Sequence, residues 1–244
     1  MSRIYEGLIS RLYERNTRNK LMVFFFPIPI IAGFLFLKLR WNNVYQSIVQ
    51  EDSYVETMQF FAYSIASILA FYSGRNFFNK NYLLNFCILF FLAFLLMFVS
   101  LEEISWGQRI FGTNTPTWFQ QHNVQNEISL HNLKPAQDVL HQFYVLTGFL
   151  CAFGWILAKY VSNIKRLRVD VRIAILLFCP RWYMMLFFMP TIIIYSYFLL
   201  NPNLGNFVIW SDQEPAELLL ALGFLLFVIS IMMRQKFISG NENK

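Results

Sequence analysis

Carboxylate and imidazole side chains gather in the polar segment 102–137 and just after it. The chain has three histidines, and His122, His131 and His141 all lie in this region. Glu127 and His131 are four residues apart, which places them on one face if the segment is helical. Glutamate and histidine bind zinc or iron, and histidine also acts as a general acid or base near neutral pH. The spacing therefore predicts a metal site or an acid–base site.

Other carboxylates occupy positions that are costly without a partner. Glu102 and Glu103 follow an apolar run, where the partial negative charge of a helix C-terminus disfavours them unless a cation compensates. Glu217 lies within the last apolar run, and an ionisable group inside a membrane marks a candidate functional site. Arg109 could hold a phosphate or carboxylate with its planar guanidinium. We predict catalytic roles for Glu102, Glu103, Arg109, Glu127 and His131, and a divalent metal such as Zn held by Glu103, Glu127, His131 and Glu217.

Helix capping offers a structural explanation for some of these carboxylates. The pattern Ser-x-x-Glu typical of a capping box ends at Glu56, Glu103 and Glu214 in the polar segments. Pro215 also suits the first turn of a helix. Thr117-x-x-Gln120 predicts the start of a short helix along the membrane surface. Capping leaves the Glu102–Glu103 pair, the Glu127/His131 face and Glu217 as the residues that most need a functional explanation.

Six apolar runs must position these side chains. A transmembrane helix needs about 20 mostly apolar residues. The runs that predict spans are Leu21–Leu37, Val55–Tyr72, Leu83–Leu101, Val139–Leu157, Trp182–Leu200 and Ala216–Met233. The run Ile173–Cys179 is too short to span, so we expect it at the interface or re-entering the membrane. The fold class is therefore all-α, a polytopic membrane helix bundle of about six transmembrane helices with a short interfacial helix in its long loop.

Composition supports a single membrane domain over residues 1–244. The chain is 57% hydrophobic and 14% charged, against roughly 25% charged in soluble domains. No polar stretch is long enough to fold alone, and Cys87, Cys151 and Cys179 read as buried apolar residues. The net charge of +6 reflects membrane orientation and is not a nucleic-acid signal, so we expect no nucleic-acid partner.

Basic residues predict the orientation. Segments 1–20, 158–181 and 234–244, together with Arg75 and Lys80, contain 16 of the 20 Lys and Arg residues. The positive-inside rule places these segments and both termini in the cytoplasm. The outer segments are then 38–54, 102–137 and 201–215, with ten of the 14 acidic residues in or beside them. We expect a bacterial inner-membrane location and contact with membrane lipids.

A motif in the long outer segment resembles a known family. The run Glu102-Glu103-Ile104-Ser105-Trp106-Gly107-Gln108-Arg109, followed by His122-Asn123, Gln125, Glu127 and Leu130-His131-Asn132, resembles a family of uncharacterised bacterial multi-pass membrane proteins. The similarity covers the second to the fourth predicted span. It implies a membrane location and supplies no mechanism.

Three functions remain open from the sequence. The first is an enzyme, with or without a metal, that acts on a lipid or lipid-linked substrate at the outer face. The second is an ion-coupled transporter, because buried carboxylates and helix-breaking prolines are common in such proteins. The third is a structural or assembly protein whose polar groups serve only to cap helices and order loops.

Overall fold

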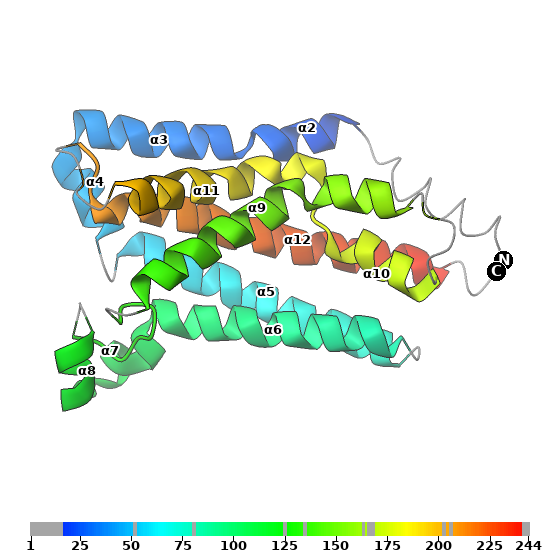
Figure 1. Cartoon of the computed structure of the whole chain (residues 1–244), viewed down its shortest axis with the longest axis horizontal. Helices are drawn as coiled ribbons and strands as arrows, with labels where there is room; N and C mark the ends of the chain where they lie inside the picture. The colour runs from blue at the N-terminus through cyan, green and yellow to red at the C-terminus, as the bar shows by residue number, and fades with distance from the viewer. Residues whose placement is uncertain are drawn as a thin grey trace.

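The computed structural model describes residues 17–50, 53–79, 82–123, 126–133, 136–162, 164, 169–201, 204 and 207–240. Every extended regular element in these ranges is a helix, and one isolated antiparallel bridge pairs Asn123 with Leu133. The long helices run roughly side by side as a bundle (Figure 1). The all-α membrane bundle predicted from the apolar runs is confirmed.

The helices follow the predicted apolar runs closely. The first half of the chain forms α2 (Thr17–Phe25), α3 (Pro27–Arg40), α4 (Asn42–Val49), α5 (Tyr54–Phe78), α6 (Leu83–Glu103), η1 (Ser105–Gly107), α7 (Gln108–Phe111) and α8 (Thr117–His122). The second half forms α9 (Gln137–Ser162), α10 (Val169–Phe178), η2 (Trp182–Met184), α11 (Met185–Leu200), η3 (Trp210–Gln213) and α12 (Glu214–Gly240). The predicted short helix in the long loop is α8.

Within the described residues, five helical stretches are long and apolar enough to cross a membrane: Thr17–Arg40, Leu83–Glu103, Val139–Val161, Ala174–Leu200 and Trp210–Gln235. The run predicted at Val55–Tyr72 does form the 25-residue helix α5, but α5 does not meet this criterion. Its buried face carries Gln59, Ser67 and Ser73. These polar groups lower its hydropathy, and the bundle shields them from lipid.

Prolines break two of the spans without ending them. Pro27 separates α2 from α3, because proline has no backbone N–H to continue the ladder of the preceding helix. Pro180 separates α10 from η2 and α11 in the same way. The short run expected at the interface or re-entering is therefore joined to the following helix in the stretch Ala174–Leu200. Its residues Ala174, Leu176 and Leu177 are buried within the bundle.

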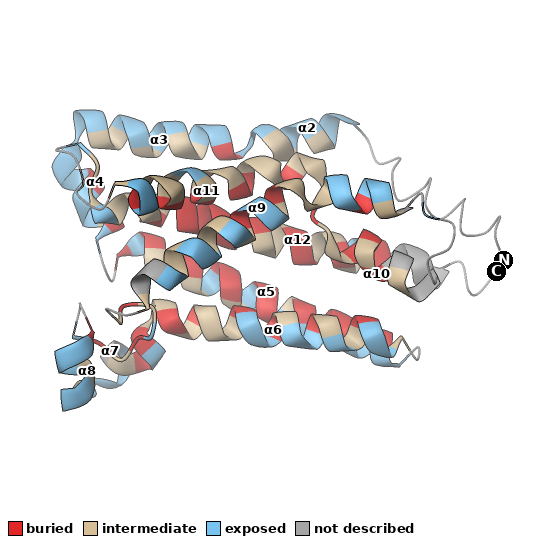
Figure 2. Cartoon of the chain, viewed as in Figure 1, coloured by how far each residue is buried: buried red, intermediate tan, exposed pale blue. Residues whose placement is uncertain are grey.

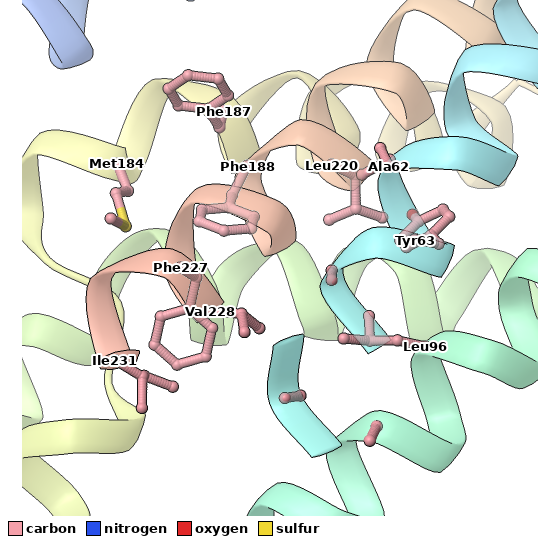
Figure 3. Close-up of a cluster of buried hydrophobic side chains, with 14 of the residues drawn as sticks. Ala62, Tyr63, Leu96, Met184, Phe187, Phe188, Leu220, Phe227, Val228 and Ile231 are labelled. Carbon is pink, nitrogen blue, oxygen red and sulfur yellow. The ribbon is translucent and has the colours of Figure 1, made fainter. Parts of the chain in front are cut away.

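The helix α12 occupies the centre of the bundle. Over half of its apolar stretch, 56%, is buried inside the protein, against 6% for Thr17–Arg40. Figure 2 shows the contrast between the largely buried α12 and the exposed α3. The core includes Phe188 of α11, Phe227 and Val228 of α12, and Tyr63 of α5 (Figure 3). The exposed apolar side chains of α3 are available to contact lipid.

Small residues and polar contacts set how closely the helices approach. A Cβ atom built on Gly223 of α12 would lie 2.9 Å from the ring of Phe188. Small residues let membrane helices come close enough for van der Waals packing. Between α5 and α6, Ser100 donates to the carbonyl of Phe60 at 3.0 Å, and Ser67 donates to that of Ala93 at 2.7 Å. These bonds fix the α5–α6 pair in an apolar surrounding.

The two ends of the bundle differ in chemistry. We call the end where α6 stops and α5, α9 and α12 start the acidic end; α4, α7 and α8 lie there too (Figure 1). It carries Glu56, Glu102, Glu103, Glu127, Asp212, Glu214 and Glu217. At the opposite end, the buried Arg234 of α12 donates to the carbonyl of Leu176 at 2.7 Å. Gln235 donates there to the carbonyl of Ser73 at 3.0 Å.

Candidate functional site

Glu102, in the last turn of α6, organises the loop that follows α8. Its Oε2 atom accepts hydrogen bonds from the backbone amides of Leu130 at 2.7 Å and His131 at 3.0 Å. The Oε1 atom accepts from the indole of Trp106 at 2.5 Å. Hydrogen bonds to a carboxylate are about twice as strong as neutral ones. These donors compensate the charge of Glu102 at the end of α6, where the sequence led us to expect a cation.

His131 completes the set of donors around Glu102. Its Nδ1 atom lies 3.1 Å from Glu102 Oε2, and its side chain is 35% exposed against 6% for Glu102. Because the carboxylate is an acceptor, Nδ1 donates in this contact, and in the neutral imidazole Nε2 then presents its lone pair. Nε2 makes no hydrogen bond to any residue that the structure describes. His131 also lies close enough to Glu217 to interact with it electrostatically.

A run of left-handed residues turns the chain back from α6 toward this loop. Ser105, Trp106 and Gly107 have φ values of 47°, 56° and 77°. Such values are unusual for serine and tryptophan and persist only where surrounding contacts hold them. The Ser105 hydroxyl donates to the Glu127 carboxylate, and both side chains are buried. The turn therefore brings the loop containing Glu127 and His131 against the end of α6.

The predicted shared helical face of Glu127 and His131 does not form. Residues 126–133 adopt bends and turns, and each side chain binds a different partner. Gln108 of α7 holds the same loop, since its Oε1 accepts from the amide of Ile128 at 2.7 Å. The spacing argument was wrong here because side-chain and backbone bonds from 102–108 compete with the helical ladder.

The other two histidines do not join His131. His122 stacks on Trp118 with ring centroids 4.7 Å apart, and its Nδ1 lies 2.8 Å from the Trp118 carbonyl oxygen. His141 of α9 packs against Tyr195, with centroids 5.1 Å apart, and against Trp210. The three histidines are close in sequence but therefore lie in three separate environments.

Carboxylates from three helices meet inside the acidic end. Glu217 of α12 accepts a hydrogen bond from the Tyr195 hydroxyl, and Glu214 accepts one from Gln59 Nε2 at 3.0 Å. Glu103 is close enough to Glu217, Glu214 and Glu56 for electrostatic interaction. Its carboxylate has no hydrogen bond or ion pair with any described residue. Glu103 and Glu217, two of the predicted metal ligands, therefore lie within electrostatic range of each other.

Ser53 caps a helix as predicted, the bond predicted from Glu56 in that capping box stays a prediction, and capping fails at the other two positions. Ser53 is the N-cap of α5 and accepts from the amide of Val55 at 3.4 Å. Ser100 instead bonds to α5, and α6 ends at Glu103 rather than starting near it. At α12 the amide of Ile209 donates to Asp212 at 2.9 Å, so Asp212 and not Ser211 orders the start of this segment. Capping does not explain Glu103 or Glu214.

An ion pair outside the predicted site also anchors this end. Lys38 of α3 forms an ion pair with Asp212, and the Tyr45 hydroxyl of α4 donates to the same carboxylate at 2.6 Å. Burial, followed by the bond to Asp212, raises the pKa of Tyr45 well above its ordinary value. Short sequence patterns could not reveal this group because its members are far apart in the chain.

Some predicted residues have no described position, and the predicted metal ligands are not grouped among the described residues. The side chains of Arg109 and Asp138 lie outside the described residues, as do Glu51 and Asp52. Within the described ranges, no three His, Cys, Asp or Glu side chains are placed to hold a metal ion. The predicted ligands Glu103, Glu127, His131 and Glu217 are not brought together there as such a group: Glu127 bonds to Ser105 and His131 to Glu102.

Sequence reasoning missed the residues that orient the predicted ones. Ser105, Gln108, Gln59 and Tyr195 each hold a carboxylate or the loop, and none is charged. No family model, curated protein or solved structure matches this chain. The assignment of the site thus depends on its own geometry.

Proposed function

We propose that this protein is an enzyme of the bacterial inner membrane that acts on a lipid or lipid-linked substrate, with His131 as general base. The observation that carries the proposal is the bond between Glu102 Oε2 and His131 Nδ1, which leaves Nε2 as an accessible proton acceptor. A carboxylate that holds one imidazole nitrogen fixes the tautomer and stabilises the imidazolium formed on proton uptake.

The chemistry would be proton abstraction from a hydroxyl group or water by His131 Nε2. General base catalysis needs a proton acceptor that titrates near the working pH and is held within reach of the reacting group. Glu217 would supply negative charge near the imidazolium, because it already lies within electrostatic range of His131. Glu102 and Glu127 act in this proposal as positioning residues, because both carboxylates hold the loop.

The surroundings of the pair support a lipid or lipid-linked substrate. Trp106, Phe111 and Trp118 are exposed beside the ends of the apolar helices. Exposed aromatic residues at the end of a span lie at the headgroup level of a bilayer. A substrate anchored in the membrane would reach His131 without leaving the headgroup region of the bilayer.

The orientation is part of the proposal. The predicted outer segments 38–54, 102–137 and 201–215 contain four of the 20 Lys and Arg residues, and the other 16 lie in the predicted cytoplasmic segments. The positive-inside rule then favours cytoplasmic termini and an acidic end on the outer face of the inner membrane. Labelling of an engineered cysteine at exposed Phe111, compared with one at exposed Tyr160, would test this orientation in intact cells.

Reconstitution tests the catalytic role. Purified protein in vesicles of bacterial total lipid extract should convert a lipid species, followed by mass spectrometry. His131→Asn should reduce the rate by about 10²-fold or more, the usual contribution of a general base. His122→Asn is the matched control in the same loop and should retain the wild-type rate. Wild-type vesicles without any lipid conversion, or a fully active His131→Asn variant, would remove the proposal.

Ion-coupled transport is the second candidate, favoured by the burial of Glu214 and Glu217 within the bundle. Buried carboxylates in membrane helices often belong to ion pathways. Vesicles loaded with a pH-sensitive dye would report a proton flux. Flux in the wild type that Glu217→Gln abolishes and His131→Asn preserves would favour transport over catalysis.

A further inference from the structure

Gln59 of α5 has a completely buried side chain with only half of its amide satisfied. Its Nε2 atom donates to Glu214 Oε2 at 3.0 Å and to the Glu214 carbonyl oxygen at 3.1 Å. Its Oε1 atom is buried and has no hydrogen-bond partner within the described part of the chain. Turning the amide over would set Oε1 against two acceptors, so the observed orientation is fixed. An unpaired buried acceptor is costly and needs an explanation.

The neighbouring groups are acceptors rather than donors. Oε1 belongs to the same amide group whose Nε2 contacts the carboxylate of Glu214. Glu214 interacts electrostatically with Glu217 and Glu56, and Glu103 interacts with Glu214. The Tyr195 hydroxyl already donates to Glu217, and Lys38 at this end is paired with Asp212. Oxygen ligands next to negative charge are the environment that hard cations prefer.

We propose that Gln59 Oε1 and the Glu214 carboxylate bind a monovalent cation, either Na⁺ or a proton carried on water. One carboxylate balances one positive charge, and the neutral amide oxygen supplies a further ligand. A divalent ion would need more carboxylates at close range than the described residues bring together. The cation would satisfy the buried Oε1 and offset the repulsion that Glu103, Glu217 and Glu56 exert on Glu214.

This site is separate from the proposed general base. His131 lies on the loop after α8, whereas Gln59 and Glu214 join the start of α5 to the start of α12. Cation binding requires neither catalysis nor transport. Its failure would leave the His131 proposal standing, and the reverse also holds.

Thermal unfolding of the full chain in detergent tests the Na⁺ arm. NaCl is titrated at constant ionic strength against N-methylglucamine chloride at one fixed pH. A ligand that binds the folded state raises the midpoint by roughly 3 °C or more for each tenfold increase in concentration above its Kd. Glu214→Gln should abolish this response. Gln59→Met, which keeps the size of the side chain but removes Oε1, should move the response to at least tenfold higher Na⁺.

Matched controls separate a lost site from a damaged fold. Gln235→Met removes a buried glutamine at the opposite end of α12, and Asp212→Asn removes a carboxylate close in sequence to Glu214. Both variants should keep the full Na⁺ response measured from their own baselines. Should Glu214→Gln fail to fold, the comparison of Gln59→Met with Gln235→Met decides the question.

The proton arm uses the same variants without Na⁺. If Na⁺ has no effect, the wild-type midpoint should depend on pH between 5 and 9 in a way that Glu214→Gln and Gln59→Met both alter and Gln235→Met does not. The proposal is overturned if wild type, Gln59→Met and Gln235→Met respond identically to Na⁺ and to pH.

Discussion

Lys38 and Asp212 form an ion pair across 174 residues of sequence, joining α3 to the 3₁₀ turn that precedes α12. Both side chains are about nine-tenths buried. The pair connects the most lipid-exposed span to the start of the central helix. It therefore fixes the outermost helix relative to the acidic end.

Removing one member of this pair should destabilise the protein. Lys38→Met leaves Asp212 buried without its cation, and breaking a buried ion pair in this way costs about 3 kcal/mol or more. Replacing both residues, as in Lys38→Met with Asp212→Leu, removes the charges together and should restore much of that loss. Denaturant unfolding in mixed micelles measures the difference. Equal stability of the single and double variants would contradict the assigned pairing.

Tyr45 gives the acidic end a dependence on alkaline pH. Its folded-state pKa lies above the ordinary value of 10.0. The unfolded chain thus releases the tyrosine proton first, and stability that is fully present below pH ~10 falls as the pH rises further. Unfolding free energies of wild type and Tyr45→Phe, measured from pH 8 to 11.5, should converge at high pH. A difference in unfolding free energy between wild type and Tyr45→Phe that stayed constant over this pH range would contradict the titration of Tyr45.

Glu102 should control the exchange of specific backbone amides. Glu102→Ala removes the acceptor for the amides of Leu130 and His131. Hydrogen bonds to a charged group contribute about 1.5–3 kcal/mol, so hydrogen exchange at these amides should accelerate by about 10- to 100-fold. Mass spectrometry of peptides covering 126–133 measures the rate. In the control His122→Asn these peptides should exchange as in wild type, and protection that survived Glu102→Ala would assign the loop to other contacts.

Any side chain at Gly223 should destabilise the protein. The Cβ atom of Gly223→Ala would meet the Phe188 ring at 2.9 Å, and forcing atoms into a filled core costs about 1–3 kcal/mol. Gly33→Ala is the matched control, because a Cβ atom there has no neighbour within 4 Å. Alanine favours a helix over glycine, so Gly33→Ala should be neutral or stabilising. Comparable losses for both variants would argue against close packing at Gly223.

The helices were predictable because each apolar run is long and bounded by polar residues. The positions of α6, α9 and α12 follow from hydropathy alone. Hydropathy also explains the disagreement over α5, whose inward face includes the polar residues Gln59, Ser67 and Ser73. A run of apolar residues predicts that a segment is a helix, but it does not say which helix lies at the centre.

The site was only partly predictable, because its contacts depend on backbone turns that have no simple sequence signal. The left-handed turn at Ser105–Gly107 directs Glu127 and His131 to different partners, which spacing along an assumed helix could not show. The Ser-x-x-Glu pattern was misleading at Ser100, whose hydroxyl binds a neighbouring helix. The burial of Glu217 was predicted, because an acidic residue within an apolar run avoids lipid by facing the interior of the bundle.

The return of the chain at Ser105–Gly107 has a consequence for the order of assembly. His131 contacts Glu102 over only 29 residues, whereas Gln59 contacts Glu214 over 155. Contacts between nearby segments close the smaller loop and form first. The histidine pair can therefore take shape once α6 and its loop have been synthesised, whereas the Gln59–Glu214 contact must wait for the last helix. The two halves of the acidic end mature at different stages of insertion.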